Sequence, residues 1–214
     1  MPPPKRSFLE RLRRSFTYGQ IGAMLARELR DCSSVIDVGC GTDSRLQYAN
    51  FRGRTIGADA YPPALSPKHP LHDEYVRCDL RDFTYPEKSV DACVLLDVIE
   101  HLTKEDGWRL VDRLERIARK RVIVATPNGF LPQPPSADNP FQEHISGWET
   151  HELREQGYRI YGLSGYKPWR GEEGNVVAQP WPLFLALSKI SEPFFVNRPE
   201  GAFALFCVKD LAQS

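Results

Sequence analysis

The sequence predicts an α/β protein built on a doubly wound, mostly parallel sheet. Two observations support this fold class. Five short apolar runs of β-type residues alternate with helical runs between residues 35 and 125, and each ends at a glycine, aspartate or proline where a loop can leave the sheet. The 214 residues are 41% hydrophobic and 26% charged, as in one soluble globular domain.

The first 30 residues are predicted to form one or two amphipathic helices that cover this domain. Apolar side chains fall close to helical spacing and arginines decorate the other side, at Phe8, Leu9, Leu12 and Phe16 and at Arg11, Arg13 and Arg14. The alternative is a helix that touches an anionic surface. Residues 31–214 are expected to form a single domain.

The five apolar runs are continuous rather than alternating, as in strands that are buried on both faces of a parallel sheet. They span residues 35–38, 54–58, 75–78, 92–96 and 121–125. The clearest helix is predicted over residues 104–119. Thr103 is a suitable N-cap, and Asp106 three residues later gives an acidic form of the capping box.

The C-terminal part of the chain differs from the rest. Residues 158–163 and 204–208 read as two further strands, and residues 166–201 between them are rich in proline, glycine and aromatic residues. Within this insertion, residues 181–195 are apolar enough for a packed helix. A lid, or a surface for an apolar partner, is the alternative.

Charge and cysteine usage exclude several classes of protein. The formal net charge is zero, which argues against a dedicated binder of duplex nucleic acid. The five cysteines form no CxxC pair, so buried thiols are expected rather than disulfides or a zinc site. No apolar run is long enough to span a bilayer, and no signal-peptide stretch is recognisable. A cytoplasmic protein is therefore expected.

A glycine turn follows the first predicted strand, at Gly39, Cys40 and Gly41. Glycines let the backbone turn tightly and let a ligand approach closely. A helix that begins near Asp43 would direct free N–H groups at that ligand. In doubly wound sheets, ligands bind beyond the carboxyl ends of the strands, which is where this turn lies.

Acidic residues end the next two strands. Asp59, about 20 residues beyond the glycine turn, suits hydrogen bonds to ribose hydroxyls. Asp79 can accept a hydrogen bond from an adenine amino group, and Leu80 can pack against the ring. Each aspartate can also be explained as a helix cap or a loop residue, but the three features follow one another in the order that a nucleotide-type cofactor requires.

Five segments resemble motifs of the class I S-adenosylmethionine-dependent methyltransferases, in particular the small single-domain type. They are VIDVGCGT, IGADA, RCDLRDF, SVDACVLLDVIEHL and RVIVATPNG, and the resemblance covers residues 35–162. It implies a Rossmann-like sheet of seven strands, mostly parallel, that ends in an antiparallel hairpin. It also implies S-adenosyl-L-methionine as the cofactor and a methyltransferase domain over residues 31–214.

Carried over by position, the resemblance assigns cofactor contacts to nine residues: Asp37 beneath the turn, Gly39, Cys40 and Gly41 at the methionine part, Asp59 at the ribose, Ala60, Asp79 and Leu80 at the adenine, and Asp97 near the sulfonium. One departure stands out, because many relatives have a third glycine where this chain has Asp43. We predict that Asp43 or Thr42 caps the following helix instead of facing the cofactor.

Two other functions are compatible with this fold. A nicotinamide-dependent dehydrogenase would use a similar glycine turn, and Gly39-x-Gly41-x-x-Ser44 is one residue from that fingerprint. However, no Tyr-x-x-x-Lys pair is placed for hydride transfer. A noncatalytic scaffold is the third possibility, but such a protein has no need of Gly39, Gly41, Asp59 and Asp79.

Methyl transfer from a sulfonium chiefly requires alignment of the acceptor with the methyl carbon, and a base assists when the acceptor is a hydroxyl. His101 and His144 are the predicted catalytic residues. In some relatives, including ubiquinone-pathway O-methyltransferases and small-RNA 2′-O-methyltransferases, a set like Asp97, Glu100, His101 and His144 holds Mg²⁺. Here Asp97 replaces the first glutamate of that set. The alternative is a metal-free cleft that the histidine orders.

The segment over residues 126–148 is too long and too rich in proline to be a simple connector. We expect it to shape the acceptor pocket, with Phe130, Phe141 and Trp148 as walls. Relatives with a similar TPNG…HxSGW segment resemble enzymes of glycan or secondary-metabolite assembly. The predicted acceptor is therefore a small molecule, with a hydroxyl of a sugar or of a polyketide-like phenol as the methylated group.

Overall fold

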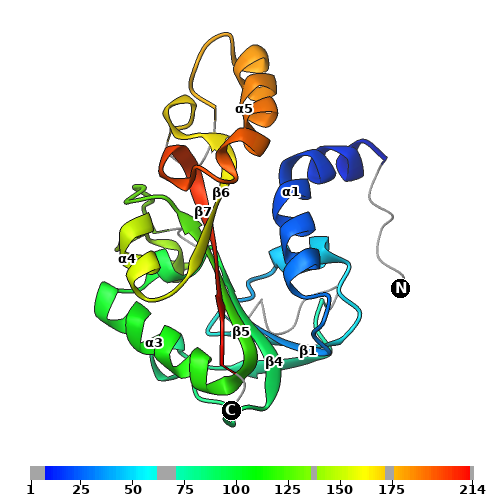
Figure 1. Ribbon diagram of the computed structural model, residues 1–214, viewed down its shortest axis with the longest axis vertical. Coiled ribbons are helices and arrows are strands. Elements are labelled where there is room, and N and C mark those ends of the chain that lie inside the picture. The colour runs from blue at the N-terminus through cyan, green and yellow to red at the C-terminus, as the bar shows by residue number, and fades with distance from the viewer. Residues whose placement is uncertain (1–7, 62–70, 136–138, 172–175, 213–214) are drawn as a thin grey trace.

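The computed structural model describes the backbone of residues 8–61, 71–135, 139–171 and 176–212, and their side chains apart from those of residues 8–17 and Pro140. Seven strands form one sheet in the order β3-β2-β1-β4-β5-β7-β6 (Figure 1). The strands are β1 (Ser34–Val38), β2 (Arg54–Asp59), β3 (Glu74–Arg77), β4 (Val90–Leu96), β5 (Ala118–Pro127), β6 (Arg159–Tyr166) and β7 (Ala202–Asp210). The predicted α/β fold with a seven-stranded sheet is confirmed.

The directions of the strands decide where a ligand can bind. β1 to β5 pair in parallel, whereas β7 is antiparallel to both β5 and β6. β6 therefore points the same way as β5, and the carboxyl ends of β1, β2, β4, β5 and β6 meet at one edge of the sheet. The strand order reverses between β1 and β4, which is the switch point where open α/β sheets bind ligands.

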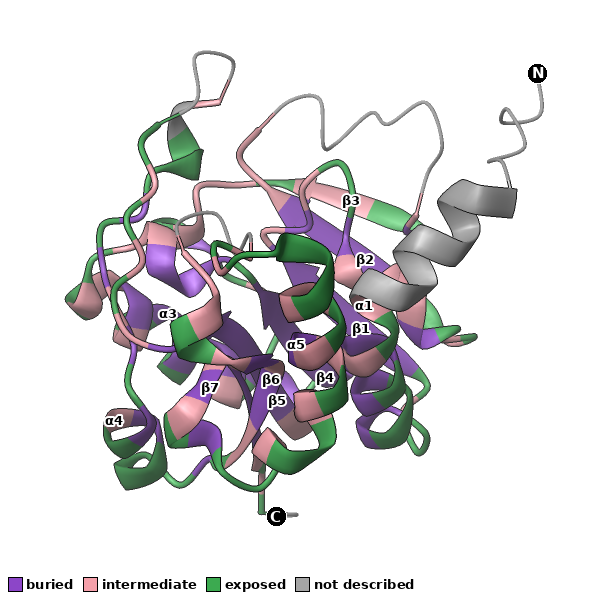
Figure 2. Cartoon of the chain, turned by 90° about the horizontal axis from the view of Figure 1, so that it is seen from above, coloured by how far each residue is buried: buried purple, intermediate pink, exposed green. Residues whose placement is uncertain are grey.

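Helices cover both faces of the sheet (Figure 1). They are α1 (Phe8–Glu28), α3 (Lys104–Ile117), α4 (Thr150–Glu155) and α5 (Trp181–Phe195). Leu110 and Leu114 of α3 pack against one face in the larger apolar cluster, while Leu25 of α1 packs with Val35 and Phe206 on the other. Figure 2 shows the strands buried between these layers. None of the described helices is both long and apolar enough to cross a membrane.

Helix α3 begins as the sequence predicts. The hydroxyl of Thr103 accepts a hydrogen bond of 3.1 Å from the backbone N–H of Asp106 and donates one of 2.9 Å to the Asp106 carboxylate. The helix ends at Ile117 rather than at residue 119, because Ala118 already belongs to β5 and pairs with Val90 of β4.

The prediction for the segment after the glycine turn was wrong. Instead of a helix that begins near Asp43, a short 3-10 helix (η1, Arg45–Ala49) follows, and Ser44 rather than Thr42 or Asp43 is its N-cap. The Ser44 hydroxyl donates to the buried Asp37 carboxylate and accepts a 3.0 Å hydrogen bond from the Leu46 N–H. Asp43 accepts a 2.7 Å hydrogen bond from the Gln47 side chain. The hydrogen bond to Asp37 holds the Ser44 side chain in place, which explains why Ser44 rather than Asp43 is the N-cap.

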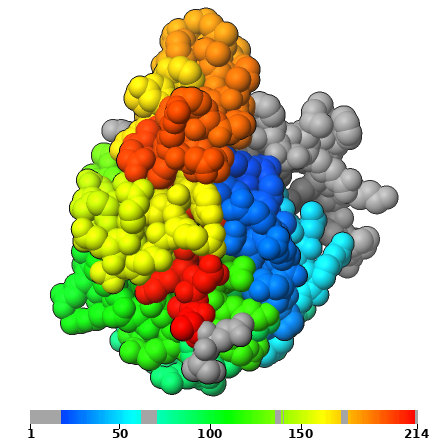
Figure 3. All heavy atoms as spheres, in the orientation of Figure 1, coloured from blue at the N-terminus to red at the C-terminus, as the bar shows by residue number. Residues whose placement is uncertain are grey.

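Helix α5 stands out from the body of the molecule at the carboxyl edge of the sheet (Figure 3). Glycines in β6 allow it to pack closely, since a Cβ at Gly162 would lie 2.3 Å from the Phe195 carbonyl oxygen and one at Gly165 would lie 2.3 Å from the Ser188 carbonyl oxygen. The opposite side of the helix exposes Ile190. The helix is therefore packed on one side and open on the other.

Candidate functional site

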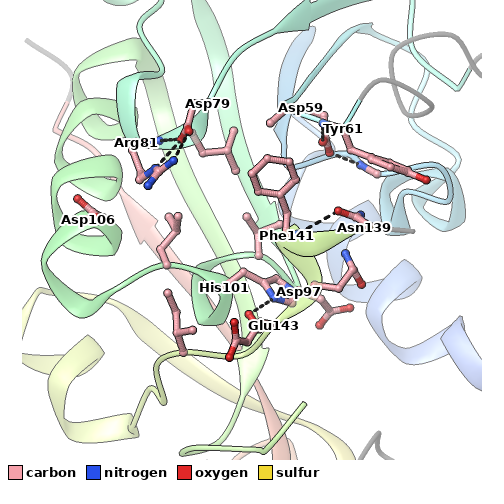
Figure 4. A pocket seen from close by; sticks show the side chains of 18 of the residues that line it. Asp59, Tyr61, Asp79, Arg81, Asp97, His101, Asp106, Asn139, Phe141 and Glu143 are labelled. Carbon is pink, nitrogen blue, oxygen red and sulfur yellow. Dashed lines mark hydrogen bonds and ion pairs between the residues drawn. The ribbon is translucent and has the colours of Figure 1, made fainter. Parts of the chain in front are cut away.

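A cavity of about 550 Å³ opens at the carboxyl edge of the sheet. Seven of the nine predicted cofactor residues line it, namely Gly39, Gly41, Asp59, Ala60, Asp79, Leu80 and Asp97. Figure 4 shows Asp59 and Asp79 on either side of this cavity, with the ring of Phe141 between them. Asp37 and Cys40 do not line it.

The glycine turn has a backbone that favours glycine at both of its ends. Gly39 and Gly41 have φ of 74° and 57°, in the left-handed region. A Cβ at Gly39 would also lie 2.6 Å from Cγ2 of Val98, in the loop after β4. The Gly39 N–H donates a 2.7 Å hydrogen bond to the Ala58 carbonyl oxygen, which ties the turn to β2.

Two buried side chains lie beneath the turn. Asp37 is 1% exposed, accepts a hydrogen bond from Ser44, and lies 3.3 Å from Nε2 of His72. Cys40 is buried, with its Sγ close to Gly57, and burial followed by the Asp37 charge raises the pKa of its thiol. The Cys40 side chain is thus a neutral packing group that faces the protein interior.

The Asp59 carboxylate links the glycine turn to the loop after β2. Its Oδ2 accepts a 2.8 Å hydrogen bond from the Gly41 N–H, and its Oδ1 accepts one of 2.7 Å from the Tyr61 N–H. Because a carboxylate oxygen can accept more than one hydrogen bond, these contacts leave acceptor capacity that can face the cavity.

Asp79 is held in a different way, at the opposite wall. It is the N-cap of a short 3-10 helix (η2, Leu80–Asp82), and it forms a 2.5 Å ion pair with the Arg81 guanidinium. The hydrogen bond from the Arg81 side chain is the main reason why the pKa of Asp79 is lowered. Asp79 therefore stays ionised near neutral pH.

A second cavity, of about 710 Å³, adjoins the first. Asp97, His101 and Gln142 line both cavities, whereas Glu100 and His144 line only the second. The second cavity extends between α1, the loop after β5 and α5. Two molecules, one in each cavity, would consequently come together at the loop after β4.

Three titratable side chains gather at this junction. Possible ligand atoms of Glu100, His101 and His144 all lie within 4.8 Å of one another. The two imidazole centroids are 4.7 Å apart. Nδ1 of His101 lies 2.8 Å from the Glu143 carbonyl oxygen, and Nδ1 of His144 lies 2.7 Å from that of Leu131. Each histidine thus directs its Nδ1 at a backbone acceptor.

The environment of the three side chains affects their protonation. Glu100 is 2% exposed and accepts a 3.0 Å hydrogen bond from the Thr126 hydroxyl. Burial, with a further contribution from the negative charge of Asp97, raises the pKa of Glu100 to about 8. Burial also lowers the pKa of His101. Both shifts favour the uncharged form of the side chain in the protein alone.

Asp97 lies beside this cluster but does not belong to it. Its φ is 58°, and its carboxylate forms a 3.1 Å ion pair with Arg45, whose guanidinium lies 4.2 Å from the centre of the Tyr18 ring. Among the described residues, the structure therefore gathers three of the four predicted metal-site residues and turns the fourth toward Arg45.

The predicted walls of the acceptor pocket were wrong. Trp148 is fully buried, packs edge-on against Trp108 and donates a 2.9 Å hydrogen bond to the Ser146 hydroxyl. Gly107 makes room for it, since a Cβ there would lie 2.6 Å from the indole. Burial of a large ring with a satisfied N–H is more favourable than its exposure in a cleft. Phe130 lines neither cavity and Phe141 lines only the first.

Several residues that line the second cavity were not predicted from the sequence. Tyr18 and Ile21 come from α1, and Leu185 comes from α5. No motif marks them, because they belong to helices whose position depends on the tertiary packing. His72 beneath the turn was also missed, since a lone histidine in a loop carries no spacing signal.

Comparison with known proteins agrees with this geometry. Residues 36–126 match the family model described as a methyltransferase domain. No curated protein matches the sequence significantly. The matched segment runs from β1 to the end of β5 and so contains the glycine turn, Asp59, Asp79 and the loop of Asp97 to His101.

Solved structures with the same fold include three named methyltransferases. A S-adenosylmethionine-dependent methyltransferase from Archaeoglobus fulgidus has a TM-score of 0.56 at 15% identity, over 95% of this chain and 100% of that one. Magnesium protoporphyrin IX methyltransferase from Synechocystis PCC 6803 has a TM-score of 0.51 at 14% identity, and the match covers 98% of this chain and 86% of that one. The small RNA methyltransferase HEN1 has a TM-score of 0.55 at 17% identity, and the match covers 92% of this chain and 25% of that one.

At these sequence identities, the similarity to the solved structures shows the fold. The match to the family model indicates a methyltransferase domain, which is the part that binds the cofactor. The chain therefore contains a methyltransferase domain and is an enzyme that uses S-adenosyl-L-methionine.

Proposed function

We propose that this enzyme transfers the methyl group of S-adenosylmethionine to a hydroxyl of a small-molecule acceptor. The junction of the two cavities at Asp97 and His101 carries the proposal. A donor in the first cavity and an acceptor in the second would meet beside two histidines. In-line displacement needs such an approach of the nucleophile to the methyl carbon.

In this proposal the first cavity holds the cofactor. The turn of Gly39 and Gly41 receives the methionine part, and Asp37 and Cys40 support the turn from beneath without contact to the ligand. Asp59 accepts hydrogen bonds from the ribose hydroxyls through its remaining lone pairs. Ala60, Asp79 and Leu80 flank the adenine, and Asp97 lies near the sulfonium, at the junction with the second cavity.

One of the two histidines, His101 or His144, acts as the base that removes the hydroxyl proton, and the other orients the acceptor. Because each Nδ1 faces a carbonyl oxygen, it carries the proton of the neutral ring, and Nε2 keeps its lone pair. The lowered pKa of His101 keeps that ring neutral near pH 7. The acceptor hydroxyl can therefore lose its proton to Nε2 as the oxygen attacks the methyl carbon.

The same cluster favours a second candidate role, the binding of a divalent cation by Glu100, His101 and His144. Two imidazole nitrogens and one carboxylate fit Mn²⁺, Fe²⁺ or Zn²⁺ better than Mg²⁺, which prefers oxygen ligands. The Nδ1–carbonyl hydrogen bonds would orient both rings, as is usual for metal-bound histidines. Such an ion would supply Lewis-acid activation of the acceptor hydroxyl.

The acceptor class is proposed from the cavity rather than from relatives. The similar structures include enzymes named for magnesium protoporphyrin IX and for small RNA, so the fold accommodates both kinds of acceptor. In this chain the second cavity has a volume of about 710 Å³, the size of a small-molecule site. By volume, a sugar or a secondary metabolite with a free hydroxyl would fit it.

Product analysis tests this function. The enzyme and S-adenosylmethionine are incubated with 2-naphthol, 4-octylphenol, methyl β-D-glucopyranoside or a short RNA, and S-adenosylhomocysteine and methylated products are measured by mass spectrometry. An O-methyl ether of one of the three small molecules is expected. Methylation of the RNA alone, or on carbon or nitrogen alone, would contradict the proposal.

A further inference from the structure

Apolar side chains from separate parts of the chain form about half of the wall of the second cavity, beside polar ones. They include Tyr18 and Ile21 of α1, Leu131 of the loop after β5, Leu163 of β6, Leu185 of α5 and Phe203 of β7. Side chains of this kind favour an apolar guest, because they gain contact without the loss of a hydrogen bond to water.

Two glutamines of the cavity wall use their amides for hydrogen bonds within the protein. Gln20 donates from Nε2 to the Gly162 carbonyl oxygen at 3.2 Å and accepts through Oε1 from the Ser164 N–H at 2.9 Å. Gln133 donates to the Gln142 carbonyl oxygen at 2.7 Å. The amides of both residues thus fix neighbouring segments of backbone.

The cations of the wall are engaged in the same way. Arg45 forms its ion pair with Asp97, Arg170 donates a 3.0 Å hydrogen bond to the Ser188 hydroxyl, and Lys189 donates one of 2.6 Å to Glu192. A guest that carries many hydroxyls would lose its hydrogen bonds to water, and it would have to break these contacts to replace them. Unreplaced hydrogen bonds of this kind oppose binding.

We infer that the acceptor has an apolar body and a single reactive hydroxyl, as in a phenol or a fatty alcohol, and that it is not a free sugar. The body lies between α1 and α5 against Ile21 and Leu185, and the hydroxyl reaches His101 and His144. This inference rests on the proposed function, because it assumes that the second cavity receives the acceptor.

Helix α5 offers a matched pair of substitutions for a test. Leu185 lines the cavity, whereas Leu183, two residues earlier, does not line it and is 52% exposed. Leu185→Arg places a bulky charge in the proposed apolar site. Leu183→Arg makes the same chemical change outside it. Leu185→Gln is a milder change that serves if the arginine variant folds poorly.

Binding is measured by calorimetry on the protein saturated with S-adenosylhomocysteine, with 2-naphthol, 4-octylphenol and methyl β-D-glucopyranoside as probes. We expect at least one of the two phenols to bind tenfold or more tightly than the glucoside. Leu185→Arg should weaken phenol binding at least tenfold, Leu185→Gln should weaken it less, and Leu183→Arg should leave it within twofold. None of the variants should change the affinity for S-adenosylhomocysteine.

The possible failures are distinguishable. Equal or tighter binding of the glucoside, no binding of either phenol, or equal effects of the substitutions at Leu185 and Leu183 would overturn the inference while leaving the cofactor site intact. If the wild-type protein did not bind S-adenosylhomocysteine, this result would instead contradict the proposed function itself.

Discussion

Nε2 of His72 lies 3.3 Å from Oδ2 of Asp37, directly beneath the glycine turn, and both side chains are only 2% exposed. The contact does not have the geometry of a hydrogen bond, and neither ring nitrogen of His72 has a hydrogen-bond partner among the described residues. The same Asp37 oxygen receives the hydroxyl of Ser44, which in turn caps η1. The pair thus supports the turn and the start of the following helix together.

His72→Gln should therefore destabilise the fold. The change removes a buried imidazole that packs against the Asp37 carboxylate beneath the turn, and we expect a loss of about 1–3 kcal/mol in the free energy of unfolding, measured by urea denaturation. His151→Gln is the control, because His151 lies at the same 3.3 Å from Glu149 but is 64% exposed. Its loss should stay within about 0.5 kcal/mol. Equal losses in the two variants would show that the buried pair has no special role.

Asp59→Ala should weaken binding of S-adenosylmethionine by about 1–3 kcal/mol, which is roughly 5-fold to 150-fold in the dissociation constant. The change removes the proposed ribose acceptor and also frees the Gly41 N–H from its 2.8 Å hydrogen bond. Calorimetry with S-adenosylmethionine measures the effect. Asp43→Ala is the control, because Asp43 accepts a hydrogen bond from Gln47 and is expected to change the constant less than twofold. A reversed order of the two effects would contradict the assignment.

Protein freed of metal by a chelator should bind one Mn²⁺ per chain, and more weakly Mg²⁺, as measured by calorimetry with the metal alone. His144→Ala removes one of the three clustered ligands and should weaken Mn²⁺ binding by tenfold or more. Asp97→Asn should weaken it less, because Asp97 pairs with Arg45. If neither ion binds, the histidines act as base without a metal. If Asp97→Asn weakened Mn²⁺ binding more than His144→Ala does, Asp97 would have to be counted among the metal ligands.

Asp91 should make the fold sensitive to acid. Burial alone would raise the pKa of its carboxyl, but the hydrogen bonds from Ser33 and the ion pair with Arg119 lower it to about 2. Since the pKa in the unfolded chain is higher, the stabilisation is present above about pH 4 and is lost as the pH falls toward 2. It amounts to about 2 kcal/mol.

Asp91→Asn should abolish this acid-dependent part of the unfolding free energy, as measured by urea denaturation at a series of pH values. Asp31→Asn is the matched change, because Asp31 also pairs with an arginine, Arg121, but its side chain is 47% exposed. Its pH dependence should resemble that of the wild-type protein. A wild-type curve that does not fall below pH 4 would contradict the prediction.

The sheet was predictable because burial on both faces leaves continuous apolar runs, and all seven expected strands occur within a few residues of their expected ends. The cofactor edge followed from the same rule, because parallel strands bring Gly39, Asp59 and Asp79 to one side. Thr103 also capped α3 as expected, since a cap depends on local sequence.

The acceptor side could not be predicted in the same way. Trp148 and Phe141 lie in one proline-rich loop, yet Trp148 enters the core through the space left by Gly107 while Phe141 projects into the first cavity. Such choices depend on three-dimensional packing rather than on periodicity. The same holds for Asp97, whose left-handed backbone and pairing with Arg45 leave no mark in the motif.

Calorimetry with three ligands tests the central claim most directly. The wild-type protein is titrated with S-adenosylmethionine, S-adenosylhomocysteine and NADH under identical conditions. Tight binding of the two adenosyl compounds and no binding of NADH is the predicted result, because the turn of Gly39 and Gly41 is followed by the strand ends of a methyltransferase. Binding of NADH alone would contradict it in favour of a dehydrogenase, and binding of none of the three would indicate a noncatalytic domain.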